Sequence, residues 1–107
     1  MTTSPKRTLA QIAADMRAQL ALENGYVPCR LGGGLELVLS RSDEHWQLVA
    51  KRTDVAPSDV EIATLRRAFG VPEEPQVRPF ARRMLTPKTR ELALYRGIEL
   101  SWREVQG

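Results

Sequence analysis

Residues 35–51 read LELVLSRSDEHWQLVAK and contain two alternating patterns separated by a polar turn. In both halves every second residue is apolar: Leu35, Leu37 and Leu39, then Trp46, Leu48 and Ala50. A period of two is typical of a strand with one buried face. We therefore predict strands over 35–40 and 45–52, joined through 42–44 into an antiparallel hairpin. Because a lone hairpin is marginally stable in water, its apolar face must be covered by other elements.

Two amphipathic segments can supply that cover. The first, predicted over 9–24, begins with a capping box formed by Thr8 and Gln11 and ends before Gly25. The second, predicted over 59–69, begins with a capping box formed by Ser58 and Glu61 and ends at Gly70, which is followed by an apolar residue and a proline. Each segment carries apolar residues at helical spacing, so we expect two helices.

The C-terminal third is ambiguous. Three prolines within 72–79 predict an extended connection, and Thr86-Pro87 is a typical helix start that favours a third helix over 86–97. The alternative interpretation makes 91–95 and 98–103 two strands around Arg96-Gly97. Alternation of apolar residues from Ile98 to Trp102 predicts a strand there in either case.

These elements define an α+β fold, with a small antiparallel sheet (the hairpin plus a C-terminal strand) and two or three helices packed on one face, in the order α-β-β-α-(α)-β. A length of 107 residues suits one domain over 1–107, with 1–7 as a disordered tail. No apolar run approaches the ~20 residues that cross a bilayer, and 1–7 lack a signal-peptide pattern. The single cysteine, Cys29, fits a reducing cytoplasm.

Residues that carry out chemistry are sparse. The chain has one histidine, His45, and one cysteine, Cys29, separated by a connection and a strand. Zinc and nucleophilic catalysis need clusters of such residues, so we expect neither an enzyme nor a metal site nor a cofactor. The run Gly32–Gly34 leads into a strand rather than a helix, which indicates a flexible turn and not a phosphate loop.

Positive charge is concentrated late in the chain. The net charge is +3 overall, with nine basic and ten acidic residues in 1–75 but seven basic and three acidic residues in 76–107. Cations and aromatic residues alternate there, as on surfaces that bind single-stranded nucleic acid, where cations contact phosphates and rings stack on bases. The candidate DNA- or RNA-binding residues are Arg78, Phe80, Arg82, Arg83, Lys88, Arg90, Tyr95 and Arg96.

Two other interpretations fit the same residues. Phe80 and Tyr95 are also suited to the core, with the arginines lying over apolar surface and pairing with Glu73, Glu91 and Glu99. Alternatively, the domain is a protein-interaction module or a homo-oligomer. Its contacts would then use an exposed strand edge or the alanine-rich face of the first helix, at Ala14, Ala18 and Ala21.

Overall fold

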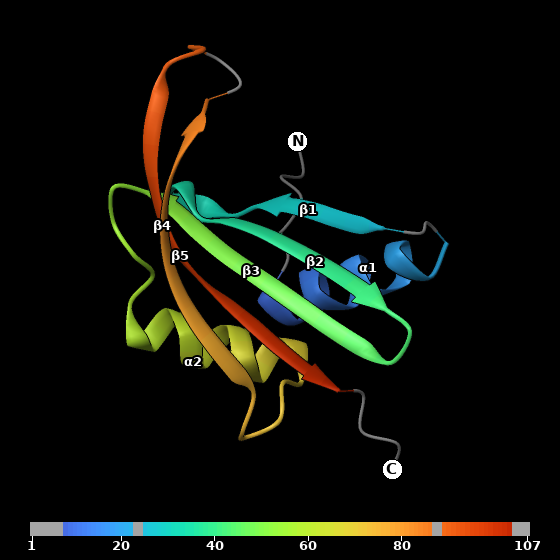
Figure 1. Cartoon of the computed structure of the whole chain (residues 1–107). Coiled ribbons are helices and arrows are strands. Elements are labelled where there is room, and N and C mark those ends of the chain that lie inside the picture. The colour runs from blue at the N-terminus through green and yellow to red at the C-terminus, as the bar shows by residue number, and fades with distance from the viewer. Residues whose placement is uncertain (1–7, 23–24, 87–88, 104–107) are drawn as a thin grey trace, which may run out of the picture.

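A computed structural model describes residues 8–22, 25–86 and 89–103. The fold is mixed α+β, with five antiparallel strands in the spatial order β1-β2-β3-β5-β4 and two helices behind the sheet (Figure 1). The elements in chain order are α1 (Leu9–Leu22), β1 (Tyr26–Arg30), a 3-10 turn at Gly32–Gly34, β2 (Glu36–Ser42), β3 (His45–Thr53), α2 (Asp59–Phe69), β4 (Gln76–Leu85) and β5 (Leu92–Arg103). The predicted tail over 1–7 lies outside the described residues.

Both predicted helix starts are confirmed. At α1 the Thr8 amide donates to Gln11 Oε1 (2.9 Å) and the Gln11 amide donates to Thr8 Oγ1 (3.2 Å). At α2 the same reciprocal pair joins Ser58 and Glu61. Gly70 ends α2 in the left-handed conformation, with φ of 65°. The first helix is described over Leu9–Leu22, and its predicted end at residues 23–24 lies outside the described residues.

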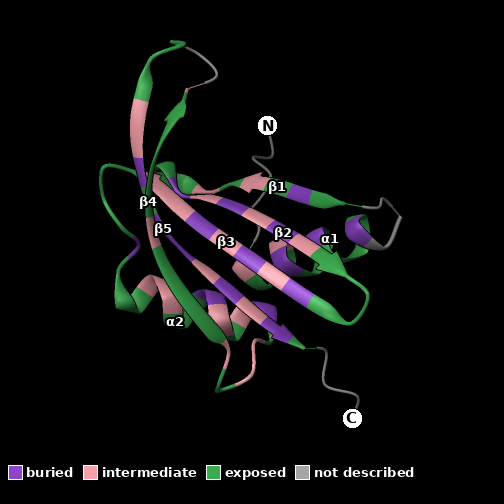
Figure 2. Cartoon of the chain, viewed as in Figure 1, coloured by how far each residue is buried: buried purple, intermediate pink, exposed green. Residues whose placement is uncertain are grey.

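The core lies between the two helices and one face of the sheet. Leu39, Leu48 and Leu100 come from three adjacent strands in direct register and are fully buried, which confirms the alternating patterns. Trp46 and Trp102 are cross-strand partners whose rings stack, with centroids 6.4 Å apart. Figure 2 shows this alternation along β2, β3 and β5. Each fully buried leucine contributes about 2 kcal/mol of hydrophobic stabilisation.

The C-terminal third folds differently from the main expectation. The predicted helix over 86–97 is wrong, because β4 and β5 form a long antiparallel hairpin closed at residues 86–91. The extended connection predicted over 72–79 is confirmed only over 72–75, since β4 begins at Gln76. Gly97, expected to end a helix, lies inside β5. A Cβ atom there would lie 2.2 Å from the carbonyl oxygen of Ala50, so only glycine allows β5 to approach β3 this closely. Residues 87–88 lie outside the described part.

The sheet therefore has five strands rather than three. The two strands that the sequence did not indicate, β1 and β4, are the edge strands, and each contains a proline (Pro28 and Pro79). Proline is tolerated at an edge because it removes no hydrogen bond from the interior of the sheet.

An ion pair joins α2 to the sheet. The Arg52 guanidinium donates two hydrogen bonds to the Glu61 carboxylate, one of them 3.0 Å long, and a third to the carbonyl of Gly33 (3.1 Å). The hydrogen bonds from Arg52, followed by the backbone bond from Ser58, lower the pKa of Glu61 to about 2. Arg52 thereby holds the glycine turn and the start of α2 against β3.

Candidate nucleic-acid interface

Both described helices, α1 and α2, lie on the same side of the sheet, and we call the other side, which no described helix covers, the open face (Figure 1). Side chains alternate between the two faces along each strand, and the register aligns them in rows across the sheet. The charged residues on the open face are Arg30, Glu36, Lys51, Arg78, Arg82, Glu99 and Arg103. Among the described strand residues, the open face thus carries five cations and two carboxylates.

Three of the predicted residues share the open face at the edge of the sheet. Arg78, Phe80 and Arg82 occupy alternate positions of β4, where every residue except the half-buried Phe80 is exposed. The Arg82 guanidinium carbon lies 5.4 Å from the centre of the Phe80 ring. Phe80 is the cross-strand partner of Gly97, so no side chain stands opposite the ring. The strand therefore presents one aromatic ring between two cations.

Glu99 partly offsets this charge. It is the cross-strand partner of Arg78, and its carboxylate lies 3.8 Å from the Arg82 guanidinium. Arg82 remains two-thirds exposed, and an ion pair that is open to water contributes only about 0–1 kcal/mol. The pair leaves Arg82 free to exchange Glu99 for another anion.

Tyr95 lies on the same face but is buried, at 6% exposure. The Lys51 ammonium lies 5.2 Å from the centre of its ring. A ring covered in this way cannot stack on a base, so any stacking role falls to Phe80. The burial of Tyr95 therefore favours the alternative interpretation, in which its ring packs inside the protein.

The remaining predicted residues are not on the open face. Arg83 and Arg96 alternate to the opposite face of the hairpin, and both are exposed. Arg90 lies in the connection between β4 and β5, with φ of 54°. Lys88 lies outside the described residues. The fold therefore divides the predicted cations between the two faces and the end of the hairpin.

Sequence reasoning missed four residues of the open face, namely Tyr26, Arg30, Lys51 and Arg103. Tyr26 is 66% exposed at the start of β1. Lys51 could have been found, because it alternates with Ala50 in a predicted strand and must face away from the core. Arg30 could not have been found without recognising β1.

The residues with catalytic side chains do not meet. Cys29 pairs with Leu37 and His45 with Ser42, which are five residues apart on β2, or about 17 Å along the strand. Within the described ranges there is no group of three or more histidine, cysteine or acidic residues that could hold a metal ion. Neither α1 nor α2 is long and apolar enough to cross a membrane.

The predicted protein-contact surfaces are accessible in part. Ala14 and Ala18 are exposed on α1, whereas the side chain of Ala21 is not among those described.

Comparison of the chain with protein-family models, with curated proteins and with solved structures finds no match. The argument for function therefore rests on the geometry of the open face and of the hairpin.

Proposed function

We propose that the protein binds single-stranded nucleic acid along the β4 side of the open face. Arg78 and Arg82 contact phosphates, and Phe80 stacks on a base. One observation carries the proposal: these three side chains project to the same side from alternate positions of a solvent-exposed edge strand. Arg83 and Arg96 point to the other face and are not part of the proposed interface. We further propose a cytoplasmic location, which suits the free thiol of Cys29.

The chemistry of the surface supports a single strand over a duplex. Exposed bases offer ring faces for stacking, and a sheet surface can follow the phosphates of a flexible strand. A duplex hides the faces of its bases, so Phe80 would gain nothing from it. We therefore expect the preference for a single strand to depend on Phe80.

Fluorescence anisotropy with a labelled oligo(dT) tests the proposal. We expect binding at about 20 mM salt that weakens steeply by about 200 mM, because each phosphate contact releases counterions. A labelled duplex of the same length should bind more weakly, and Phe80→Ala should remove most of that difference. If oligo(dT) and its RNA counterpart both fail to bind at low salt, the proposal is wrong.

Two double variants separate this interface from general charge. Arg78→Ala with Arg82→Ala should reduce the slope of log K against log salt by about 1.4, at ~0.7 per phosphate contact on a single strand. Arg83→Ala with Arg96→Ala removes the same charge from the opposite face of the same hairpin and should leave most of the affinity. Glu99→Gln should tighten binding, since it removes the carboxylate between the two cations. Equal losses in the two double variants would contradict the assignment.

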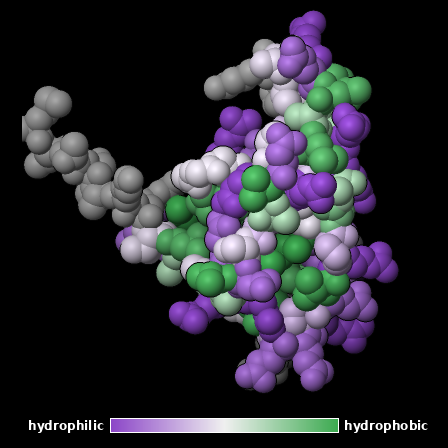
Figure 3. All heavy atoms as spheres, turned by 90° about the vertical axis from the view of Figure 1, so that its left-hand side faces the viewer, coloured by the Kyte–Doolittle hydropathy of each residue, from purple (hydrophilic) through white to green (hydrophobic). Residues whose placement is uncertain are grey.

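A protein partner at the β4 edge is the second candidate function. An edge strand leaves backbone groups unpaired, and exposed apolar side chains surround this edge: Val77, Met84, Leu85 and Leu92. Figure 3, which faces this side of the molecule, shows hydrophobic groups clustered between hydrophilic ones. Light scattering over a hundredfold concentration range tests self-association, which would be lost in Val77→Arg.

A further inference from the structure

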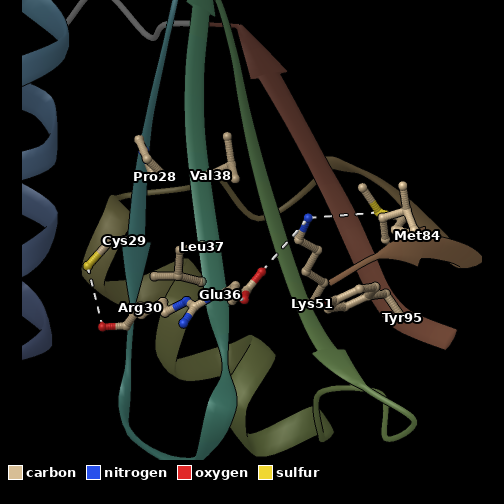
Figure 4. Close-up of a pocket in the computed structure, with 10 residues that line it drawn as sticks. Pro28, Cys29, Arg30, Glu36, Leu37, Val38, Lys51, Met84 and Tyr95 are labelled. Atoms are coloured by element: carbon tan, nitrogen blue, oxygen red, sulfur yellow. Dashed lines mark hydrogen bonds and ion pairs between the residues drawn. The ribbon is translucent and has the colours of Figure 1, made fainter. Parts of the chain in front are cut away.

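A hollow of about 480 Å³ opens on the open face beside the proposed nucleic-acid interface, since Tyr95, which lines the hollow, is the cross-strand partner of Arg82. Met84 and Leu85, at the end of β4, line it together with residues of β1, β2, β3 and β5 (Figure 4). Its lining consists of Pro28, Cys29, Arg30, Glu36, Leu37, Val38, Lys51, Met84, Leu85 and Tyr95. The volume lies within the range of ~300–1,000 Å³ that small-molecule sites commonly have.

The charged part of the hollow is a row of three side chains from adjacent strands. Arg30 lies 3.1 Å from one Glu36 oxygen, and the Lys51 ammonium lies 3.9 Å from the other. Two cations thus share one carboxylate, which leaves one positive charge without a counterpart in the row. A ligand with a single negative charge would neutralise it.

Lys51 is the cation best placed to bind such a ligand. Its side chain is only 17% exposed, so its charge acts across partly desolvated surroundings. The contacts of its ammonium are all weak: a long ion pair with Glu36, the ring of Tyr95 at 5.2 Å, and the sulfur of Met84 at 4.0 Å. A carboxylate at hydrogen-bond distance would replace these contacts with stronger ones.

The rest of the hollow is apolar. Pro28 and Val38 lie beside the charged row, and Met84 lies beyond Lys51 at the end of the row (Figure 4). Leu85, from the same end of the hairpin, also lines the hollow. Met84 is 40% exposed and Leu85 is 66% exposed. A hydrocarbon group of a ligand that packed against them would remove this apolar area from water, which favours binding. Methionine is unbranched and adapts to ligands of different shape.

We propose that this hollow binds a small apolar acid, a single carboxylate on a hydrocarbon chain or ring, with the carboxylate on Lys51 and the hydrocarbon against Val38, Met84 and Leu85. The site shares no residue with the Arg78–Phe80–Arg82 row. Its test therefore does not depend on nucleic-acid binding.

Octanoate is a suitable probe, and the methyl resonance of Met84 reports on the site. We expect a saturable shift with a Kd on the order of 1 mM, which suits a ligand of this size. The methyl of Met16, in the core on the other face, serves as an internal control and should not move. Octan-1-ol has the same chain without the charge and should bind about tenfold more weakly.

Two variants with opposite expected effects complete the test. Lys51→Met should weaken octanoate binding about tenfold, whereas Arg103→Met, which removes a cation from the far end of the same face, should not. Glu36→Gln should tighten binding about threefold, because it removes the carboxylate that competes for Lys51, and a misfolded variant cannot gain affinity. Equal binding of octanoate and octanol, or unchanged affinity in both Lys51→Met and Glu36→Gln, would overturn the proposal.

Discussion

The β4–β5 hairpin and the part of the sheet that the helices cover belong to one hydrogen-bonded sheet but differ in how far their residues are buried. In β2 and β3 the residues facing the helices are almost fully buried, as Leu39 and Leu48 show. In β4 every residue except Phe80 is exposed, and Figure 2 shows the contrast along the strand. Apolar burial thus stabilises one region, while the other region is free to hold side chains for a ligand. On this comparison the core-facing strands supply stability, and the proposed nucleic-acid interface lies on the exposed edge strand.

The largest expected effect is on the covered region. Phe69 is fully buried in α2, so Phe69→Ala should lower the free energy of unfolding by about 3–5 kcal/mol. Leu92, at the hairpin, is 63% exposed, and Leu92→Ala should change the free energy of unfolding by less than about 0.5 kcal/mol. Urea unfolding followed by tryptophan fluorescence measures both. Similar losses in the two variants would remove the distinction between the regions.

Gly97 lies where the two regions meet. A methyl group there would contact the backbone of Ala50 and Lys51, so we expect Gly97→Ala to destabilise the protein by about 1–3 kcal/mol. Gly32→Ala is the matched control, since an added Cβ at Gly32 meets nothing within 4 Å. Stability of Gly97→Ala equal to that of Gly32→Ala would mean that β5 does not need this close approach.

The ion pair between Arg52 and Glu61 gives a smaller, pH-dependent effect. Gln still completes the capping box, so Glu61→Gln removes only the charge and should cost about 1–2 kcal/mol at pH 7. The pKa of Glu61 is about 2 in the folded protein and near 4.5 otherwise, so the pair stabilises the fold above pH 4.5. That stabilisation is lost as the pH falls toward 2.

Urea unfolding of both proteins between pH 2 and 7 measures this difference. The difference in the free energy of unfolding between wild type and Glu61→Gln should be largest at pH 6–7 and should disappear toward pH 2. Glu74→Gln, at an exposed carboxylate, should show no such difference. A difference that persisted unchanged at pH 2 would show that the charge of Glu61 is not responsible.

The same contrast explains what the sequence could predict. Leu37, Leu48 and Leu100 alternate with polar residues because one side of each strand is buried, and that pattern identified three strands. In β4 the helix-side positions Pro79 and Ala81 are exposed, so no alternation marks the strand. The cations of the proposed interface were predicted in composition but not in arrangement, because the sequence did not indicate β4, and it is the alternation of side chains along a strand that makes Arg82 and Arg83 face opposite ways.

Backbone amide shifts during an oligo(dT) titration test the central claim most directly, namely that the uncovered side of the sheet at β4 is the binding surface. We expect the largest shifts at Arg78, Phe80, Arg82 and their partner Glu99, with α1 and α2 unaffected. Shifts centred on the helices, or on the face that carries Arg83 and Arg96, would contradict the account.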